Sequence, residues 1–182
     1  MLEREVKLSF DSPEQARAAV IAARATLIRS RRLQHDVLFD SADQQLRLRG
    51  CALRIRFEDG AGALTFKGPV VPGSMKVREE HETKVDDPAA LRRVLEGLGY
   101  QAWFTYEKFR EEYALPDLVA AVDETPVGTY VELEGSEPAI LTATQLIGRT
   151  PADFILASYR MLFLASRPAS GPSAGDMVFP LR

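Results

Sequence analysis

Hydrophobic and charged residues alternate along much of this chain. In residues 1–10, Leu2, Val6 and Leu8 alternate with Glu3, Glu5 and Lys7, and a period of two predicts a β-strand. Similar patterns predict further strands at 34–40, 46–49, 52–58, 63–67, 75–85, 103–115, 118–124 and 128–134. Turn signals such as Asp59-Gly60-Ala61-Gly62 separate several of them. The chain is therefore predicted to be mainly antiparallel β.

Four segments have helical signals instead. Ser12 followed by Pro13 and Gln15 predicts a helix start, and the helix extends over 13–27. Asp87 caps a helix at 88–98, another is predicted at 137–147, and Thr150 caps one at 151–165. Many evenly spaced strands with a few helices predict an α+β fold, in which a closed β-barrel has helices packed outside.

The composition predicts one soluble globular domain. Of the 182 residues, 46% are hydrophobic and 27% are charged, and the net charge of −3 gives no general attraction to nucleic acid or anionic membranes. Cys51 is the single cysteine, so no internal disulfide can form and a cytoplasmic location is expected. We predict a single domain over 1–165 and a loosely ordered tail over 166–182, to which Met177, Val178 and Phe179 could give an anchor. Trp103 and the phenylalanines are expected in the core.

The polar faces of the predicted strands consist largely of ionisable residues. They are Glu3, Glu5 and Lys7; Arg54 and Arg56; Lys67; Lys76, Arg78, Glu80, Glu82 and Lys84; Lys108 and Arg110; and Glu132 and Glu134. Two geometries fit this pattern. The charges can lie outside in solvent, which is the usual case for a charged face, or they can point into a wet barrel lumen while helices cover the apolar faces.

Three features favour the lumen. Several strands have charges of one sign only, whereas a surface selected for solubility mixes the signs. Like charges two residues apart repel one another and require a compensating ligand. The segments 13–27 and 151–165 are also apolar enough to need a sheet face to cover.

A lumen with both signs indicates a particular chemistry. Glutamates at i and i+2 place two carboxylates about 7 Å apart on one face, so two strands can bring carboxylates together around Mg²⁺ or Mn²⁺. Lysine and arginine in a confined space are suited to a polyanion with several phosphates. The residues alone therefore favour a metal-dependent site for a phosphorylated ligand.

The ordered set of motifs resembles the CYTH superfamily, the triphosphate tunnel metalloenzymes. Glu3-x-Glu5-x-Lys7 resembles its ExExK signature, Ala52-Leu53-Arg54-Ile55-Arg56 its ALRIR strand, and Leu64-Thr65-Phe66-Lys67-Gly68-Pro69 its LTxKGP strand. Arg78-Glu79-Glu80-His81-Glu82, Lys108-Phe109-Arg110, Val122-Asp123 and Tyr130-Val131-Glu132-Leu133-Glu134 follow in the family's order, as do Gln34-x-Asp36 and Ser158-Tyr159. Within these motifs, the residues are most similar to those of the class IV adenylyl cyclase (CyaB-like) branch. Leu38-Phe39 departs from the Tyr-Phe that is frequent in the family, which leaves the recognition of a base open.

The resemblance implies an eight-stranded barrel and assigns roles to its residues. Metal ligation or its support falls to Glu3, Glu5, Glu80, Glu82, Asp123, Glu132 and Glu134. Phosphate binding falls to Lys7, Arg54, Arg56, Lys67, Arg78, Lys108 and Arg110. The most direct catalytic roles fall to Glu3, Glu5, Lys7 and Lys108.

Three functions remain open from the sequence. The favoured one is Mg²⁺- or Mn²⁺-dependent hydrolysis of inorganic or small organic triphosphate, because it needs no group beyond these motifs. The second is class IV adenylyl cyclase, which converts ATP to cyclic AMP and pyrophosphate. The third is non-catalytic binding of polyphosphate or nucleotides, which the glutamate pairs argue against. The expected partner is a small triphosphate, without nucleic acid or membrane, and the chain is expected to be a monomer or homodimer.

Overall fold

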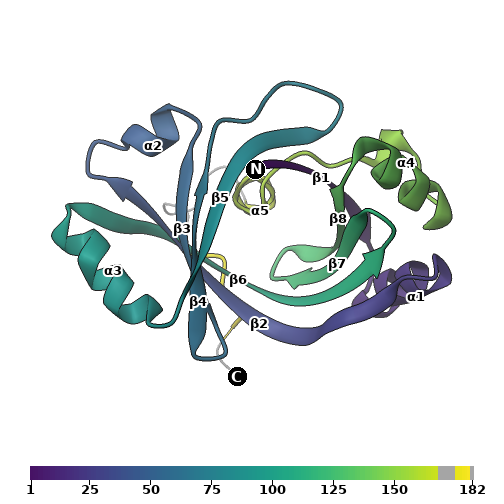
Figure 1. The fold of residues 1–182 in the computed structure, drawn as a ribbon, viewed down its shortest axis with the longest axis horizontal. Coiled ribbons are helices and arrows are strands. Elements are labelled where there is room, and N and C mark those ends of the chain that lie inside the picture. Colours follow the sequence, from purple (N-terminus) through teal and green to yellow (C-terminus); the bar gives the residue numbers. More distant parts are fainter. Residues whose placement is uncertain (168–174, 181–182) are drawn as a thin grey trace.

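The computed structural model describes residues 1–167 and 175–180. Eight strands form a closed barrel in the order β1-β5-β4-β3-β2-β6-β7-β8, and every neighbouring pair is antiparallel. The strands are β1 Leu2–Phe10, β2 Thr26–Ser41, β3 Ala52–Glu58, β4 Ala61–Lys67, β5 Lys76–Val85, β6 Tyr100–Leu115, β7 Leu118–Thr125 and β8 Gly128–Gly135. The prediction of an eight-stranded closed antiparallel barrel with helices is confirmed (Figure 1).

The helices lie around this barrel. They are α1 Pro13–Ala22, α2 Gln45–Leu48, α3 Pro88–Gly97, α4 Glu137–Leu146 and α5 Tyr159–Ala165, with a 3-10 turn at Pro151–Asp153. Helices α1 and α4 lie on one side of the barrel and α2 and α3 on the other, while α5 is seen near the open centre of the ring (Figure 1). None of the helices in the described residues is long and apolar enough to cross a membrane.

The apolar core lies between the barrel wall and the outer helices. Val6 and Leu8 of β1 are fully buried in a cluster that includes Val20 of α1 and Ile140 of α4. A second cluster beneath α3 contains Val37, Phe39, Ile55 and Leu95. The apolar strand faces therefore point outward under helices, which leaves the charged faces for the lumen, as the second of the two geometries requires.

The predicted helix at 13–27 is too long and the predicted strand at 34–40 too short. The side chain of Ser12 accepts a hydrogen bond from the Gln15 backbone NH, so the helix begins as expected. It ends at Ala22 because Arg24 adopts a left-handed conformation with φ of 63°. The chain then enters β2 at Thr26, and β2 pairs along its length with β6.

The predicted strand at 46–49 is wrong, because these residues belong largely to α2. The carboxylate of Asp40 accepts hydrogen bonds from the backbone NH groups of Leu46, at 2.9 Å, and Arg47, at 3.0 Å. Ser41 Oγ accepts a third from Gln45. These acceptors satisfy NH groups that a first helical turn leaves without partners, so side chains outside the segment determine its conformation.

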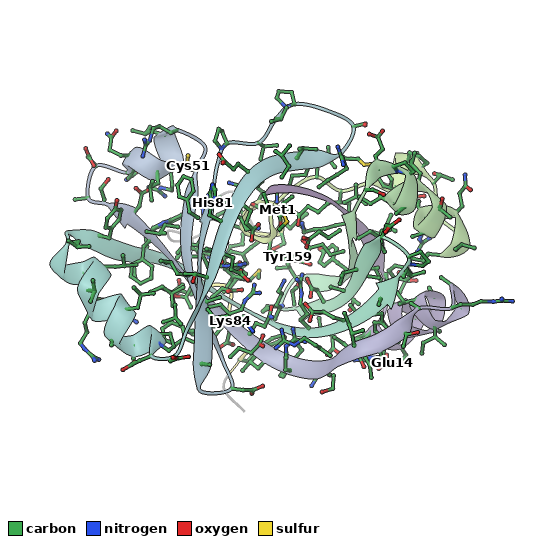
Figure 2. All side chains as sticks on the ribbon, viewed as in Figure 1. Met1, Glu14, Cys51, His81, Lys84 and Tyr159 are labelled. Atoms are coloured by element: carbon green, nitrogen blue, oxygen red, sulfur yellow. The ribbon has the colours of Figure 1, made fainter. Side chains whose placement is uncertain are left out.

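The predicted continuous helix at 151–165 is also wrong. After the 3-10 turn, Ile155 forms an antiparallel bridge with Lys7 of β1 through two backbone hydrogen bonds, which holds the chain extended. Ser158 then caps α5 by accepting from the Met161 NH. The break brings Tyr159 inside the ring of strands, whereas Glu14 of α1 points away from it (Figure 2).

The last described residues lie along β6. Met177 is fully buried, and backbone hydrogen bonds join it to Thr105 and Glu107. The ring of Phe179 lies 5.2 Å from that of Phe109, measured between centroids. Met177 and Phe179 thus hold this stretch on the barrel, while residues 168–174 and 181–182 of the predicted tail lie outside the described residues.

Candidate functional site

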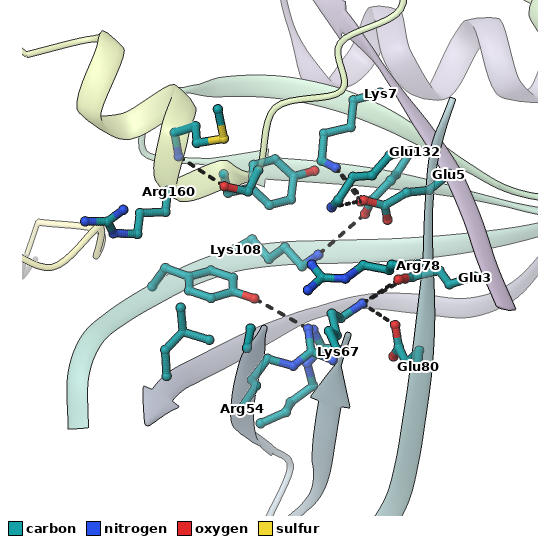
Figure 3. A pocket seen from close by; sticks show the side chains of 18 of the residues that line it. Glu3, Glu5, Lys7, Arg54, Lys67, Arg78, Glu80, Lys108, Glu132 and Arg160 are labelled. Atoms are coloured by element: carbon teal, nitrogen blue, oxygen red, sulfur yellow. Dashed lines mark hydrogen bonds and ion pairs between the residues drawn. The ribbon is translucent and has the colours of Figure 1, made fainter. Parts of the chain in front are cut away.

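The lumen contains a cavity of about 510 Å³. All the predicted site residues line it except Asp123: Glu3, Glu5, Lys7, Arg54, Arg56, Lys67, Arg78, Glu80, Glu82, Lys108, Arg110, Glu132 and Glu134. They come from β1, β3, β4, β5, β6 and β8, because the period-two alternation turns the charged face of each of these strands inward. Figure 3 shows several of them pointing toward one another.

The cavity is positively charged although the chain is not. Ten lysine and arginine side chains line it against seven glutamates, an excess of three positive charges that the buried carboxylates of Asp36 and Asp123 reduce to one, in a protein of net charge −3. Eight of these seventeen groups are buried, and most of the others are partly buried. Their field is therefore screened less than that of surface charges, and it favours a multiply charged anion.

Lysine amino groups hold the carboxylates at one side of the lumen. Lys67 Nζ lies 2.8 Å from Glu3 Oε1 and also contacts Glu80 (Figure 3). Lys7 Nζ lies 3.1 Å from Glu5 Oε1 and 2.8 Å from Glu132 Oε1. Although burial opposes the charged amine, Glu132 and Glu5 together raise the pKa of Lys7. These ammonium groups therefore act as counter-ions at the positions where carboxylates converge.

Asp123 lies on the lumen side of β7, beneath the side chains that line the cavity. Its carboxylate is fully buried and accepts hydrogen bonds from Lys108 Nζ at 2.9 Å, Arg110 Nε at 2.7 Å and the Tyr159 hydroxyl at 2.6 Å. With its oxygens committed to these donors, Asp123 is placed to orient the cations. Of the two roles open to it, support of the cations fits this geometry better than direct metal ligation.

Lys108 is the lysine of this group with a strongly lowered pKa. Burial, then the positive charge of Arg110, lowers its pKa to about 8, against the opposing effects of Asp123 and Glu132. A bound polyanion would favour the ammonium form of Lys108. The protonation state of Lys108 can therefore change when a charged ligand enters the lumen.

The arginines of β3 are fixed by a second buried carboxylate. Arg56 donates two hydrogen bonds to Asp36, at 2.9 and 3.0 Å, and Arg54 Nε lies 3.6 Å from the same carboxylate. Arg54 also donates to Thr65 at 2.9 Å and to the Tyr106 hydroxyl at 3.4 Å. The guanidinium groups are thus preorganised before any ligand binds.

Arg78 is held by backbone oxygens instead. Its guanidinium donates to the carbonyls of Gly68 and Gly50. This residue lines the cavity while also tying β5 to the segments after β4 and before β3.

The glutamates fit a divalent cation by their charge. Although the Glu134 side chain reaches solvent, partial desolvation beside the tunnel wall raises its pKa to about 7, and the charges of Glu3, Glu132 and Glu5 add to this effect. Among the described residues no cationic group lies within 4.0 Å of Glu134. Crowded carboxylates of this kind are stabilised by a hard cation. In the present side-chain arrangement no three acidic, histidine or cysteine groups of the described residues converge as a ready-made metal site, because lysines occupy them.

Several cavity residues were not assigned a role from the sequence. Lys76 contacts Glu5 from the start of β5, and its place on the charged face of 76–84 was the available signal. Tyr106 follows the same alternation as Lys108 and Arg110. Trp103, expected in the core, packs against the apolar cluster that contains Phe104, but it is only half-buried and also lines the cavity beside Arg47 and Arg160. Its orientation depends on an irregularity in β6 that alternation cannot reveal.

The barrel and its charged lumen are those of a CYTH protein. The model of the CYTH domain matches residues 1–147, so this chain belongs to the CYTH family. The predictions of that family and of an enzyme of its kind are thereby confirmed.

Individual relatives agree with this assignment. A Methanocaldococcus jannaschii protein named "Putative adenylate cyclase" is 33% identical over 137 residues, which cover 75% of this chain and 78% of the relative. Among solved structures, one from Vibrio parahaemolyticus, named in the same way, has a TM-score of 0.78 at 18% identity and covers 91% of this chain and 99% of its own. A Hippeastrum structure, described as an adenylyl cyclase homologue with a dominant triphosphatase activity, has a TM-score of 0.67 at 22% identity and covers 92% and 98%. At these identities the two structures show the shared fold.

Proposed function

We propose that this protein hydrolyses a triphosphate, inorganic or organic, inside the barrel with the help of Mg²⁺ or Mn²⁺. The observation that supports this most strongly is the composition of the lumen, in which preorganised cations face a group of crowded glutamates within one cavity of about 510 Å³. Cations alone would suffice for binding, whereas the glutamates become useful when a metal accompanies the anion.

The residues have distinct tasks in this proposal. Lys7, Arg54, Arg56, Lys67, Lys108 and Arg110 bind the phosphate oxygens, and Arg78 joins them at the wall. Glu3, Glu5, Glu132 and Glu134 hold the metal, with Glu80 and Glu82 beside them. When bound, the metal supplies Lewis-acid polarisation of the phosphoryl group and an acidified water. The arginines, fixed by Asp36 and Asp123, stabilise the charge that develops on the transferring phosphoryl group without reorganising.

Adenylyl cyclisation is the second candidate, and the M. jannaschii relative is the observation that favours it. Both reactions use the same metal and cations, but they differ in the bond that breaks. In hydrolysis water attacks a phosphoryl group, whereas in cyclisation the ribose 3′-oxygen attacks the α-phosphorus and pyrophosphate leaves.

The products distinguish the two reactions. Incubation with ATP and Mg²⁺ or Mn²⁺, followed by phosphorus NMR, separates phosphate, pyrophosphate and cyclic AMP. Hydrolysis predicts free phosphate or pyrophosphate without cyclic AMP. Cyclic AMP appearing in equal amount to pyrophosphate would replace hydrolysis with the cyclase assignment.

A third possibility is a polyphosphate-binding protein without catalysis. Calorimetric titration with inorganic triphosphate tests it, once with metal and once with a chelator. Equal affinity in both would show that the glutamates do not require a metal, and would contradict both enzymatic proposals.

A further inference from the structure

One part of the cavity differs from the charged centre. Leu38, Ala52, Trp103 and Met161 line it together with Arg47 and Arg160. In Figure 3, Arg160 lies at one side of the pocket and Glu3 and Glu80 at the other, with Lys108 and Arg54 between them. The cavity thus combines an aromatic region with a metal and phosphate region.

A β-bulge directs Trp103 into this region. In the ladder between β2 and β6, Leu38 pairs with Phe104 and Phe39 pairs with Ala102, so Trp103 has no partner. Regular alternation would place Trp103 on the opposite face from Tyr106 and Lys108, yet all three line the same cavity. Bulges beside functional sites commonly re-aim a side chain in this way.

Two guanidinium groups lie against the indole. The guanidinium carbon of Arg47 is 4.2 Å from the centroid of the Trp103 ring, and that of Arg160 is 4.8 Å from it. Arg47 Nε makes no hydrogen bond within the described residues but lies 3.7 Å from Asp40 Oδ2, and Arg160 has no carboxylate partner there. The indole is half-buried and packs against the apolar cluster that contains Phe104, so the part of it that lines the cavity can contact a ligand there.

We propose that Trp103 is the stacking platform for a planar heteroaromatic ring, the organic end of a triphosphate whose phosphates lie among the central cations. This rests on the proposed function, and it makes Trp103 the residue that favours a ring-bearing organic triphosphate, while the charged centre alone still accepts inorganic triphosphate. An extra phosphate would use the two arginines but would gain nothing from Leu38, Ala52 or Met161. A π-system stacks on both indole and guanidinium planes, so a heteroaromatic ring uses the whole region.

Trp103 reports on its own occupancy, because it is the one tryptophan in the chain. Stopped-flow fluorescence of the metal-loaded protein, recorded before turnover, is compared for ATP, GTP, CTP, UTP and inorganic triphosphate. We expect at least one nucleoside triphosphate to quench the fluorescence strongly, and inorganic triphosphate to have little effect. Equal responses to all five ligands would overturn the stacking proposal.

A variant series separates stacking from a structural role. Trp103→Leu should lower kcat/KM for the best nucleoside triphosphate by roughly 5- to 150-fold, the usual range for loss of one stacked base, and leave inorganic triphosphate within about twofold. Trp103→Phe should retain most of the activity. Phe109→Leu is the matched control, since Phe109 lies on the same strand under the guanidinium of Arg31 at 3.7 Å but outside the cavity.

The outcomes are distinguishable. Equal losses on nucleoside and inorganic substrates in Trp103→Leu would show a structural role and overturn the inference. Turnover of inorganic triphosphate alone, without quenching by any nucleotide, would also overturn it while leaving the proposed function in place. No turnover and no binding of any of the five would refute the proposed function itself.

Discussion

In the proposed function, single carboxylates hold the metal in the lumen. Glu5 contacts Lys7 and Lys76 and is almost fully buried. Glu5→Gln keeps the shape and an acceptor oxygen but removes the charge, and Glu3→Gln does the same nearer to Lys67. We expect either change to lower kcat by about 100-fold or more with an unchanged circular dichroism spectrum. Near-wild-type turnover in either variant would remove these residues from the metal site.

Lys67 tests the phosphate side of the site. Because it bridges Glu3 and Glu80, it is placed to move from carboxylate to phosphate when a ligand arrives. Lys67→Ala should raise KM for the triphosphate by roughly 10- to 150-fold, corresponding to one charge-assisted hydrogen bond. Lys84→Ala is the control, because Lys84 lies on the neighbouring strand β5 but is exposed and outside the cavity (Figure 2). An equal change in both variants would assign the effect to general electrostatics.

The raised pKa of Glu134 predicts how the free energy of unfolding depends on pH when a chelator is present. Its pKa in the folded protein, about 7, lies above the ordinary value of 4.5, so between these values the folded chain binds more protons than the unfolded one. The free energy of unfolding should therefore fall as the pH rises through this window. Thermal unfolding across it should show a smaller decrease for Glu134→Gln than for the wild type. The same slope in both proteins would show that Glu134 does not titrate as described.

At the scale of elements, the strands were predictable and the short helices were not. Alternation identified β1, β3 and β4 because one face of each is apolar and covered by helices outside, and it identified β5 from its row of charges, although its other face carries the exposed Glu79, His81 and Thr83. It failed for α2, whose conformation depends on Asp40 at the end of β2, and for 151–165, where pairing of Ile155 with Lys7 interrupts the helix.

The same limits apply to the site. The charged residues were found because ionisable side chains recur at every second position of the strands. The order of these residues along the chain also matched a known set of motifs. Trp103 was assigned to the core because the bulge that turns it inward depends on register with Leu38 and Phe39, which are distant in sequence. Local patterns cannot reveal an irregularity that exists only between two paired strands.

Helix α2 gives a prediction at this scale. Asp40→Ala removes two hydrogen bonds to the first NH groups of α2 and should lower the free energy of unfolding by about 1–2 kcal/mol in urea denaturation. Because α2 contains Arg47, the change should also disturb the region around Trp103, seen as a shift in its fluorescence. Asp86→Ala, at an exposed position outside α2, is the control and should do neither. An unaltered stability in Asp40→Ala would show that this cap does not determine α2.

At the scale of the whole molecule, the barrel separates charged side chains, which point inward, from apolar side chains, which point outward. A chain of net charge −3 encloses a site whose lining cations outnumber the glutamates, and a small positive excess remains after Asp36 and Asp123 are counted, because charged residues share the inward strand faces. The outer faces bury apolar residues under α1, α3 and α4, so stability comes from the outside of the barrel and the interior is left for a ligand. This division explains why so many buried ions can coexist with a stable fold.

The most direct test of the account is the release of phosphate from inorganic triphosphate, followed by phosphorus NMR with Mg²⁺ or Mn²⁺ and again after chelation. Inorganic triphosphate requires only the charged centre, so the measurement does not depend on the role of Trp103. The account predicts steady release with either metal, and loss of that release with the chelator or in Glu5→Gln. Release that continues unchanged after chelation, or no release with either metal, would contradict it.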